Sequence, residues 1–268
     1  MNVERLSTED AERCAEEIAA IIAKTTTAGA GDKQNERAGF LLFRTPASRI
    51  QEQIKNPDNT FLVVRGEDKK IAGFVHLAKY PAPVDGTRVK DGHATQTLMV
   101  EKVAADPCSG QKGMMRALYE SAQVIAKKEG LCLGAYVATH PQTNLASLKA
   151  HAALGFKVSG DYGGKGTEFM GRENYGSVYL TAPDGLSAGN RTSDEKAGQW
   201  GEFSADLRAT PTFQEAPYAT EPKDRTALKS LMGASAVSPA VTREEPAPLR
   251  GAGFATSTPV KAPSLGKV

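Results

Sequence analysis

The segment from Leu98 to Lys128 constrains the fold more than any other, because it predicts a strand, a tight turn and a helix in direct succession. Apolar and β-branched residues between Leu98 and Val103 predict the strand, and Pro107 ends it because proline has no N–H to give to a strand ladder. Small residues then predict a turn into a helix that begins at about Lys112. The first N–H groups of a helix lack intrahelical partners and lie at the positive end of the helix dipole. This junction therefore predicts a binding site for phosphate or another anion.

A second strand and helix follow in the same order. The run Leu131–Thr139 predicts a buried strand, and the helix after it places Asn144, Ser147 and His151 on one face. Gly155 supplies the left-handed residue that ends this helix. The turn and helix between the two strands predict that the strands run parallel.

These two units resemble the GNAT superfamily of acyl-CoA-dependent N-acyltransferases. The family's pyrophosphate turn, Gln/Arg-x-x-Gly-x-Gly/Ala, corresponds to the stretch from Gly110 to Met115, which keeps the central Gly113. Gly110 replaces the usual Gln or Arg, and Met115 replaces the final small residue. The family's second motif, Asn-x-x-Ala/Ser-x-x-x-Tyr-x-x-x-Gly-Phe, is matched by Asn144, Ser147, His151, Gly155 and Phe156. The resemblance covers roughly residues 1–182.

The resemblance implies acetyl-CoA as a co-substrate and no metal. Backbone N–H groups of the turn would bind its pyrophosphate, and Lys112 would add a positive charge. The residues of that turn are Gln111, Lys112, Gly113 and Met114. Asn144 and Ser147 would also bind the cofactor, with the Asn144 amide on the pantetheine chain.

Two residues are candidates for proton transfer. Glu101 would take a proton from the acceptor amine. An amine with a pKa near 10 is protonated at neutral pH and must lose that proton before it can attack a thioester. His151 stands where the family has a tyrosine and would protonate the departing thiolate near neutral pH. Backbone N–H groups of Val103 or Ala105 would polarise the thioester carbonyl.

Each candidate has a structural alternative. The turn is also typical of an ordinary helix start, and Asn144 is also a suitable helix cap. His151 is equally compatible with a histidine on a helix surface, and Glu101 with a solvent-facing charge on a strand.

The order of predicted elements is β-α-α-β-β-β-α-β-α-β-β, which indicates an α/β (α+β) fold with a mixed sheet of about seven strands flanked by helices. The resemblance adds that the two parallel strands splay apart. We expect an acyltransferase domain over residues 1–183, with the loop 163–175 lying over the acceptor site. Predicted strands are 2–6, 61–64, 71–77, 95–104, 131–139, 156–162 and 177–181.

The remaining residues, 184–268, form a Pro/Ala/Ser-rich extension that we expect to be mostly irregular. Eight of the fifteen prolines lie there, and the single candidate helix is Lys223–Met232. Trp200, Phe203, Phe213, Tyr218 and Phe254 are possible anchors, on a partner assembly or on the extension's own domain.

The net charge of +2 does not favour nucleic acid or a membrane as the main partner. Three cysteines, Cys14, Cys108 and Cys132, have no metal-ligand spacing and fit reduced thiols. The sequence has no apolar run of membrane length, and its N-terminus is charged. Together with the reduced thiols, these features indicate a cytoplasmic protein.

Three functional hypotheses follow. The first is an N-acetyltransferase that moves an acetyl group from acetyl-CoA to a primary amine by direct attack. The second is a catalytically weak or inactive GNAT-fold structural protein whose C-terminal tail docks on a larger assembly, such as a phage virion. The third is an effector that acetylates a host protein. The acceptor (a small molecule or a protein) and the oligomeric state stay open.

Overall fold

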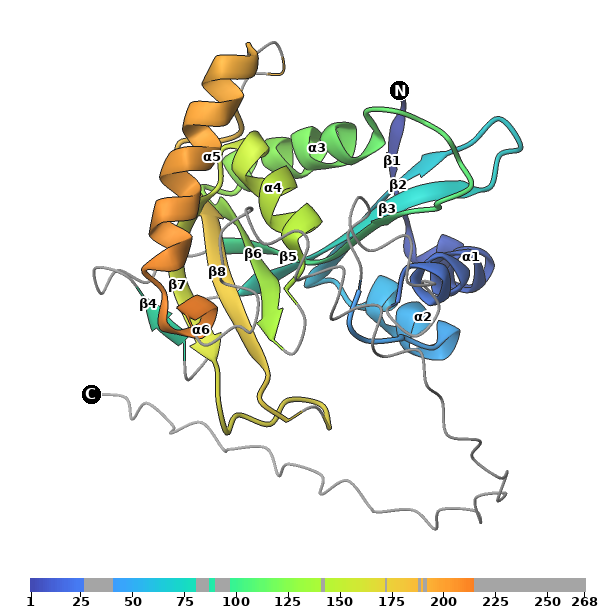
Figure 1. Ribbon diagram of the computed structural model, residues 1–268. Coiled ribbons are helices and arrows are strands. Elements are labelled where there is room, and N and C mark those ends of the chain that lie inside the picture. The colour runs from blue at the N-terminus through green and yellow to red at the C-terminus, as the bar shows by residue number, and fades with distance from the viewer. Residues whose placement is uncertain are drawn as a thin grey trace, which may run out of the picture. The chain divides into compact units, whose positions relative to one another are not determined.

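The computed structural model describes residues 1–26, 41–80, 87–89, 97–140, 143–171, 173–187, 189 and 192–214. In this part of the chain, one mixed sheet has eight strands in the order β1-β2-β3-β5-β6-β8-β7-β4 (Figure 1). The strands are β1 (Val3–Arg5), β2 (Asn59–Arg65), β3 (Ile71–Tyr80), β4 (Thr87–Val89), β5 (Thr97–Ala105), β6 (Cys132–His140), β7 (Lys157–Gly163) and β8 (Gly176–Ala182). The mixed sheet is confirmed, and β4 is a strand that the sequence did not predict.

Helices cover both faces of the sheet (Figure 1). They are η1 (Thr8–Asp10), α1 (Ala11–Thr25), α2 (Ala47–Lys55), α3 (Met114–Lys128), α4 (Leu145–Leu154), α5 (Ser193–Arg208) and α6 (Pro211–Gln214). One buried cluster joins the sheet to α1 and α2, and a larger one joins the other face to α3, α4, α5 and α6.

Alternate side chains of strand β2 are buried in the two different clusters. Phe61 and Val63 belong to the cluster under α1 and α2, whereas Leu62 and Val64 belong to the cluster under α3. Because successive side chains of a strand point to opposite faces, an unbroken apolar run is what a central strand with helices on both sides requires.

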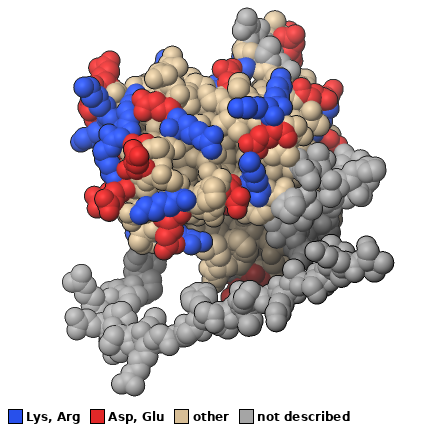
Figure 2. All heavy atoms as spheres, turned by 180° about the vertical axis from the view of Figure 1, so that it is seen from behind, with Lys and Arg blue, Asp and Glu red and all other residues tan. Residues whose placement is uncertain are grey.

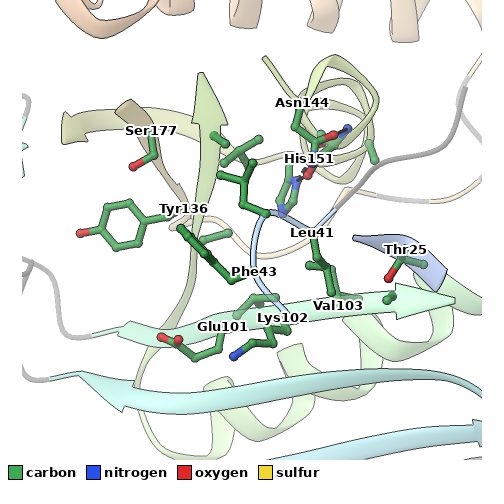
Figure 3. A pocket seen from close by; sticks show the side chains of 18 of the residues that line it. Thr25, Leu41, Phe43, Glu101, Lys102, Val103, Tyr136, Asn144, His151 and Ser177 are labelled. Atoms are coloured by element: carbon green, nitrogen blue, oxygen red, sulfur yellow. Dashed lines mark hydrogen bonds between the residues drawn. The ribbon is translucent and has the colours of Figure 1, made fainter. Parts of the chain in front are cut away.

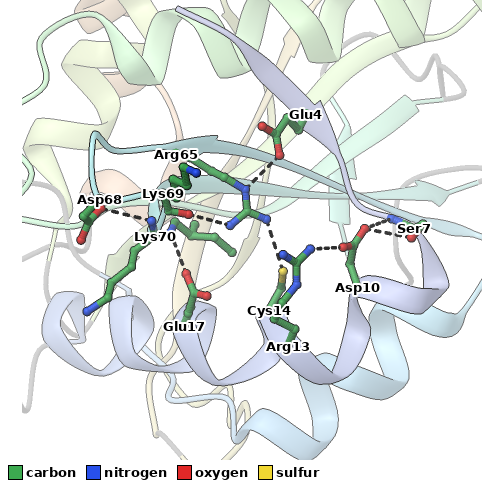
Figure 4. A network of polar contacts seen from close by, with 11 residues as sticks. Glu4, Ser7, Asp10, Arg13, Cys14, Glu17, Arg65, Asp68, Lys69 and Lys70 are labelled. Carbon is green, nitrogen blue, oxygen red and sulfur yellow. Dashed lines mark hydrogen bonds and ion pairs between the residues drawn. The ribbon is translucent and has the colours of Figure 1, made fainter.

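Polar contacts fix α1 to the edge of the sheet (Figure 4). Arg65 donates from Nε to Glu4 at 3.0 Å and from Nη1 to the Lys69 carbonyl oxygen at 3.0 Å. The Glu17 carboxylate on α1 accepts a hydrogen bond of 2.7 Å from the Ile71 N–H at the start of β3. The Glu17 contact thereby holds α1 to β3, and the Arg65 contacts hold β2 to β1 and to the β2–β3 turn.

Pairing between the two parallel strands stops halfway. Strands β5 and β6 are each nine residues long, but they pair only from Thr97 opposite Cys132 to Val100 opposite Ala135. Beyond that point β5 continues beside β3 and β6 continues beside β8. The expectation that these strands splay apart is confirmed.

A β-bulge stands where the strands part. Val100 pairs with Leu77 of β3, and Lys102 pairs with His76, so Glu101 is an extra residue in β5. A bulge bends its strand and increases the local twist, which directs β5 away from β6. The bulge thus opens the sheet and presents Glu101 at the opening.

Residues 193–214 of the extension pack against the same sheet. Helix α5 begins with a reciprocal capping box between Thr192 and Glu195. Phe203, Leu207 and Phe213 are buried in the larger core, on α4 and the strands β6, β7 and β8. The prediction of only one candidate helix in the extension, Lys223–Met232, is therefore wrong, because α5 and α6 are two helices that the sequence did not predict.

Three of the five expected anchors, Trp200, Phe203 and Phe213, contact the domain itself. Phe203 and Phe213 are buried, and the Trp200 ring lies 5.8 Å from the Lys149 ammonium of α4. Tyr218, Phe254 and the candidate helix Lys223–Met232 lie outside the described residues.

Charges on the surface are mixed in sign. Figure 2 shows basic and acidic side chains interspersed over the back face of the described residues, in keeping with the net charge of +2. Of the described helices, none has the length and apolar character needed to cross a membrane.

Candidate active site

The splayed strands border a cleft of about 700 Å³ (Figure 3). Its walls are the free edges of β5 and β6, helix α4, the start of α3 and residues 41–45. Glu101 and Lys102 lie on the β5 side, and Asn144 and His151 lie on the α4 side opposite. Most of the lining is apolar, with a few polar groups, as is typical of a small-molecule site.

The turn before α3 adjoins this cleft without lining it. Pro107 and Met115, on either side of the turn, line the cleft, but Gln111, Lys112, Gly113 and Met114 do not. Met114 is buried under the sheet, whereas Lys112 and Gly113 are exposed.

The start of α3 nevertheless suits an anion. Gly113 is the N-cap residue with φ +81°, no side chain caps the helix, and its first turn carries no acidic residue. The first N–H groups are therefore open to an external acceptor. Gln111 Oε1 is buried with no hydrogen-bond partner in the described part of the chain. These features fit the diphosphate and amide groups of CoA, despite the bulkier Met115.

Asn144 caps helix α4. Its Oδ1 accepts a hydrogen bond of 3.1 Å from the Ser147 N–H, so the helix-cap alternative describes one role of this side chain. Asn144 and Ser147 both also line the cleft, as the family motif implies.

His151 lies inside the protein. It is 4% exposed, and its Nδ1 donates to the Ser147 carbonyl oxygen at 2.8 Å. Its Nε2 then accepts from the Tyr119 hydroxyl at 2.7 Å. Burial lowers the pKa of His151 from 6.5 to about 4, although the Ser147 hydrogen bond opposes this. The surface alternative is wrong, and so is the expectation that this ring titrates near neutral pH.

Tyr119 is a cleft residue that the sequence reading missed. It comes from α3, is 1% exposed and lines the cleft beside His151. Burial raises the pKa of its hydroxyl above the ordinary value. Its position four residues after Met115 on the same helix was the available signal, because such residues share a face.

Glu101 is exposed at the bulge and lines the cleft. Burial, the Glu101 charge and a hydrogen bond with Glu101 raise the pKa of the neighbouring Tyr80 hydroxyl. Burial lowers the pKa of Lys102, with Glu101 opposing the change and Arg49 adding to it. Glu101 is therefore a carboxylate held between a phenol and a partly desolvated ammonium.

Val103 and Ala105 also line the cleft. On one side they pair with Val75 and Gly73 of β3, and on the other side β6 has already departed. This edge of β5 is available for a ligand in the cleft.

Four aromatic residues form one end of the cleft: Phe43, Tyr162, Phe169 and Tyr175. We call them the aromatic cluster. Tyr162 is the second-last residue of β7, Tyr175 precedes β8, and Phe169 belongs to the loop between these strands. Phe169 and Tyr175 of the loop 163–175 line the cleft, and the expectation that this loop lies over the acceptor site stays a prediction. Among the described residues, no group of three or more His, Cys, Asp or Glu could hold a metal ion.

Comparison with known proteins gives one family and many similar folds. Residues 31–156 match the family model for the acetyltransferase (GNAT) family. The ribosomal-protein-S18-alanine N-acetyltransferase from Escherichia coli is similar at 16% identity and a TM-score of 0.45, over 71% of this chain and 98% of that chain. The ribosomal-protein-alanine N-acetyltransferase from Brucella melitensis is similar at 15% identity and a TM-score of 0.45, over 68% and 98% of the two chains.

A third similar structure is an aminoglycoside 6'-N-acetyltransferase complexed with coenzyme A. Its identity is 11% and its TM-score 0.45, over 68% of this chain and 96% of that chain. Identities this low concern the fold alone. No curated protein sequence matches the chain.

Proposed function

We propose that this chain transfers an acetyl group from acetyl-CoA to a primary amine by direct attack. The chain belongs to the acetyltransferase (GNAT) family through residues 31–156 and is an acyltransferase. The observation that carries this proposal is the parting of β5 and β6 at the Glu101 bulge, which leaves a cleft bordered by free strand edges. Bound acetyl-CoA supplies the activated acyl group as a thioester.

The chain's own backbone would hold the co-substrate. The N-terminal N–H groups of α3, from Gly113 onward, face outward for the diphosphate, and the exposed Lys112 lies next to them. The β5 edge at Val103 and Ala105 offers peptide groups to the amide chain and to the thioester carbonyl.

Glu101 would serve as the base. An acceptor amine enters as an ammonium and must give up one proton before its lone pair can attack. The Glu101 carboxylate lines the cleft at the bulge and can accept that proton directly or through water.

Tyr119 would assist the departing sulfur in place of a protonated His151. In the arrangement seen, Tyr119 donates to Nε2 of a neutral His151. The Ser147 hydroxyl, 3.3 Å from Nδ1, can donate to that nitrogen in the other ring tautomer. Nε2–H then donates to the Tyr119 oxygen, and the Tyr119 proton is free to hydrogen-bond the sulfur.

The test combines binding with turnover. We expect calorimetry to detect acetyl-CoA binding and a thiol-release assay to detect amine-dependent turnover. Glu101→Gln should lower kcat/KM by about 10² to 10⁴ without loss of acetyl-CoA binding. Glu67→Gln, an exposed carboxylate in the β2–β3 turn, is the matched control. Absence of acetyl-CoA binding at millimolar concentration would remove the proposal.

The role of Tyr119 has its own test. Tyr119→Phe should reduce kcat by about tenfold or more while acetyl-CoA still binds, because a donor to developing charge is lost. An unchanged kcat in a reaction limited by acyl transfer would assign this hydroxyl to structure alone.

A further inference from the structure

The aromatic cluster is a continuous surface of ring faces and edges. Phe169 stacks on Tyr175 with centroids 4.7 Å apart and contacts Phe43 and Tyr162 edge-on at 5.7 and 6.1 Å. Phe43 and Tyr162 also lie 6.3 and 6.2 Å from Tyr175. Three separate segments of the chain therefore bring rings to the same place.

This surface is open on the side of the cleft. All four rings line it, and Phe169 keeps 36% of its surface exposed while Tyr175 is buried behind it. The neighbouring Met170, also in the lining, is 69% exposed with a positive φ of 49°, a backbone conformation that side chains other than glycine seldom adopt. A large apolar surface held in this way next to a site favours a ligand that covers it.

The aromatic cluster lies near the proposed base. Burial chiefly raises the pKa of the Tyr175 hydroxyl, and the charge of Glu101 adds to the rise. Tyr136, from β6, also lines the cleft, as does Phe43 (Figure 3). An acceptor whose amine faces Glu101 thus has aromatic rings within its reach.

Charge in the cleft argues against polycationic acceptors. In the described lining the cationic side chains are Lys24, Arg44 and Lys102, and the carboxylate is Glu101. Lys24 is paired with Asp106 at 2.7 Å, which leaves two cations against one carboxylate. An acceptor with several ammonium groups, such as a polyamine or an aminoglycoside, would meet repulsion after its first amine was placed.

We propose that the acceptor is an arylalkylamine, a primary amine joined by a short chain to one aromatic ring. This rests on the proposed acetyl transfer. The ring packs against Phe169 and Phe43, where offset and edge-on ring contacts are favourable, and the single amine faces Glu101. The ammonium gives one proton to Glu101, and the amine nitrogen then bonds to the acetyl carbon. The carbon–sulfur bond breaks, the sulfur leaves with the electron pair as the CoA thiolate, and the thiolate takes up the second proton lost by the nitrogen.

The experiment compares three amines on the full-length protein with acetyl-CoA: 2-phenylethylamine, its saturated analogue 2-cyclohexylethylamine, and spermidine. We expect kcat/KM for phenylethylamine to exceed that for cyclohexylethylamine by about tenfold and that for spermidine by more. Phe169→Leu, which keeps an apolar side chain but removes the ring, should abolish the preference between the first two amines. Phe43→Leu, from a different segment, should reduce it independently of the loop that carries Phe169.

Calorimetry with acetyl-CoA separates this proposal from the proposed function. If acetyl-CoA binds and the favoured amine is spermidine or the saturated analogue, the arylalkylamine proposal is overturned while acetyl transfer stands. The same holds if both leucine variants keep the wild-type preference. Loss of acetyl-CoA binding in the wild-type protein overturns both. Val124→Ala, on the exposed side of α3, is the control that leaves all three rates unchanged.

Discussion

Replacing His76 with phenylalanine should make folding less sensitive to acid. His76 lies on β3, is 2% exposed, and stacks on Phe61 with centroids 4.3 Å apart. Neither of its ring nitrogens has a hydrogen-bond partner among the described residues. Burial, and then the charge of Lys102, lower the pKa of His76 from 6.5 to about 3. The folded protein therefore keeps this ring neutral at pH values where the unfolded chain binds a proton.

The size of the effect follows from the two pKa values. Well above pH 6.5 neither state binds the proton, and the free energy of unfolding is at its full value. As the pH falls below 6.5 the unfolded state binds it and the folded state does not, so stability declines. Between pH 7 and pH 5 the loss due to His76 is about 2 kcal/mol. His151, with a folded pKa of about 4, adds a loss of similar size that the substitution leaves in place.

Urea denaturation at pH 7 and pH 5 measures this directly. We expect the wild-type protein to lose about 2 kcal/mol more than His76→Phe over that interval. At pH 7 the variant should be at least as stable, because two unpaired buried nitrogens are removed. Phe61→Leu is the matched control: it weakens the stack but keeps the histidine, so it should retain the wild-type pH dependence. Equal losses in wild type and His76→Phe would refute the reasoning.

Two further predictions concern the fold. Gly163→Ala should cost about 2 kcal/mol or more of unfolding free energy by urea denaturation, because φ is +77° and the new Cβ would collide with the Tyr175 carbonyl oxygen. Gly166→Ala has a similar φ of +81° but open space around it, so it should cost less; equal costs would contradict the collision. Phe203→Ala should destabilise the domain by about 3 to 4 kcal/mol, because it empties a core position between α5 and the sheet. A loss under 1 kcal/mol would mean that α5 is not part of the cooperative unit.

The central strands and helices were predictable because local pattern and tertiary environment agree there. Met114, Leu118 and Ala122 repeat at helical spacing and are all buried, as expected for one face of α3. Helix α5 was missed because Gly198 and Gly201 lower its helix propensity and its buried apolar side chains are few. The readable signal was its start, where Thr192 and Glu195 form a capping box.

The sequence identified several residues that line the cleft, but not the hydrogen bonds between them or the bulge in β5. Glu101 and His151 both line the cleft, as expected. The hydrogen bond from Tyr119 to His151 joins residues 32 positions apart, and no local pattern encodes it. The bulge was equally hidden, because it is visible only in how β5 pairs with β3.

The parted strands have a consequence for how this protein tolerates substitution. Beyond Val100 and Ala135, the facing edges of β5 and β6 expose peptide N–H and C=O groups toward each other across the opening. Every non-proline residue carries these groups, so most side-chain replacements along the edges leave them in place. In the proposed function, a pantetheine chain between these strands would hydrogen-bond to the backbone itself, and the departures Gly110 and Met115 in the turn would alter only part of its binding site. Alanine scanning would therefore understate how much of the binding these edges supply.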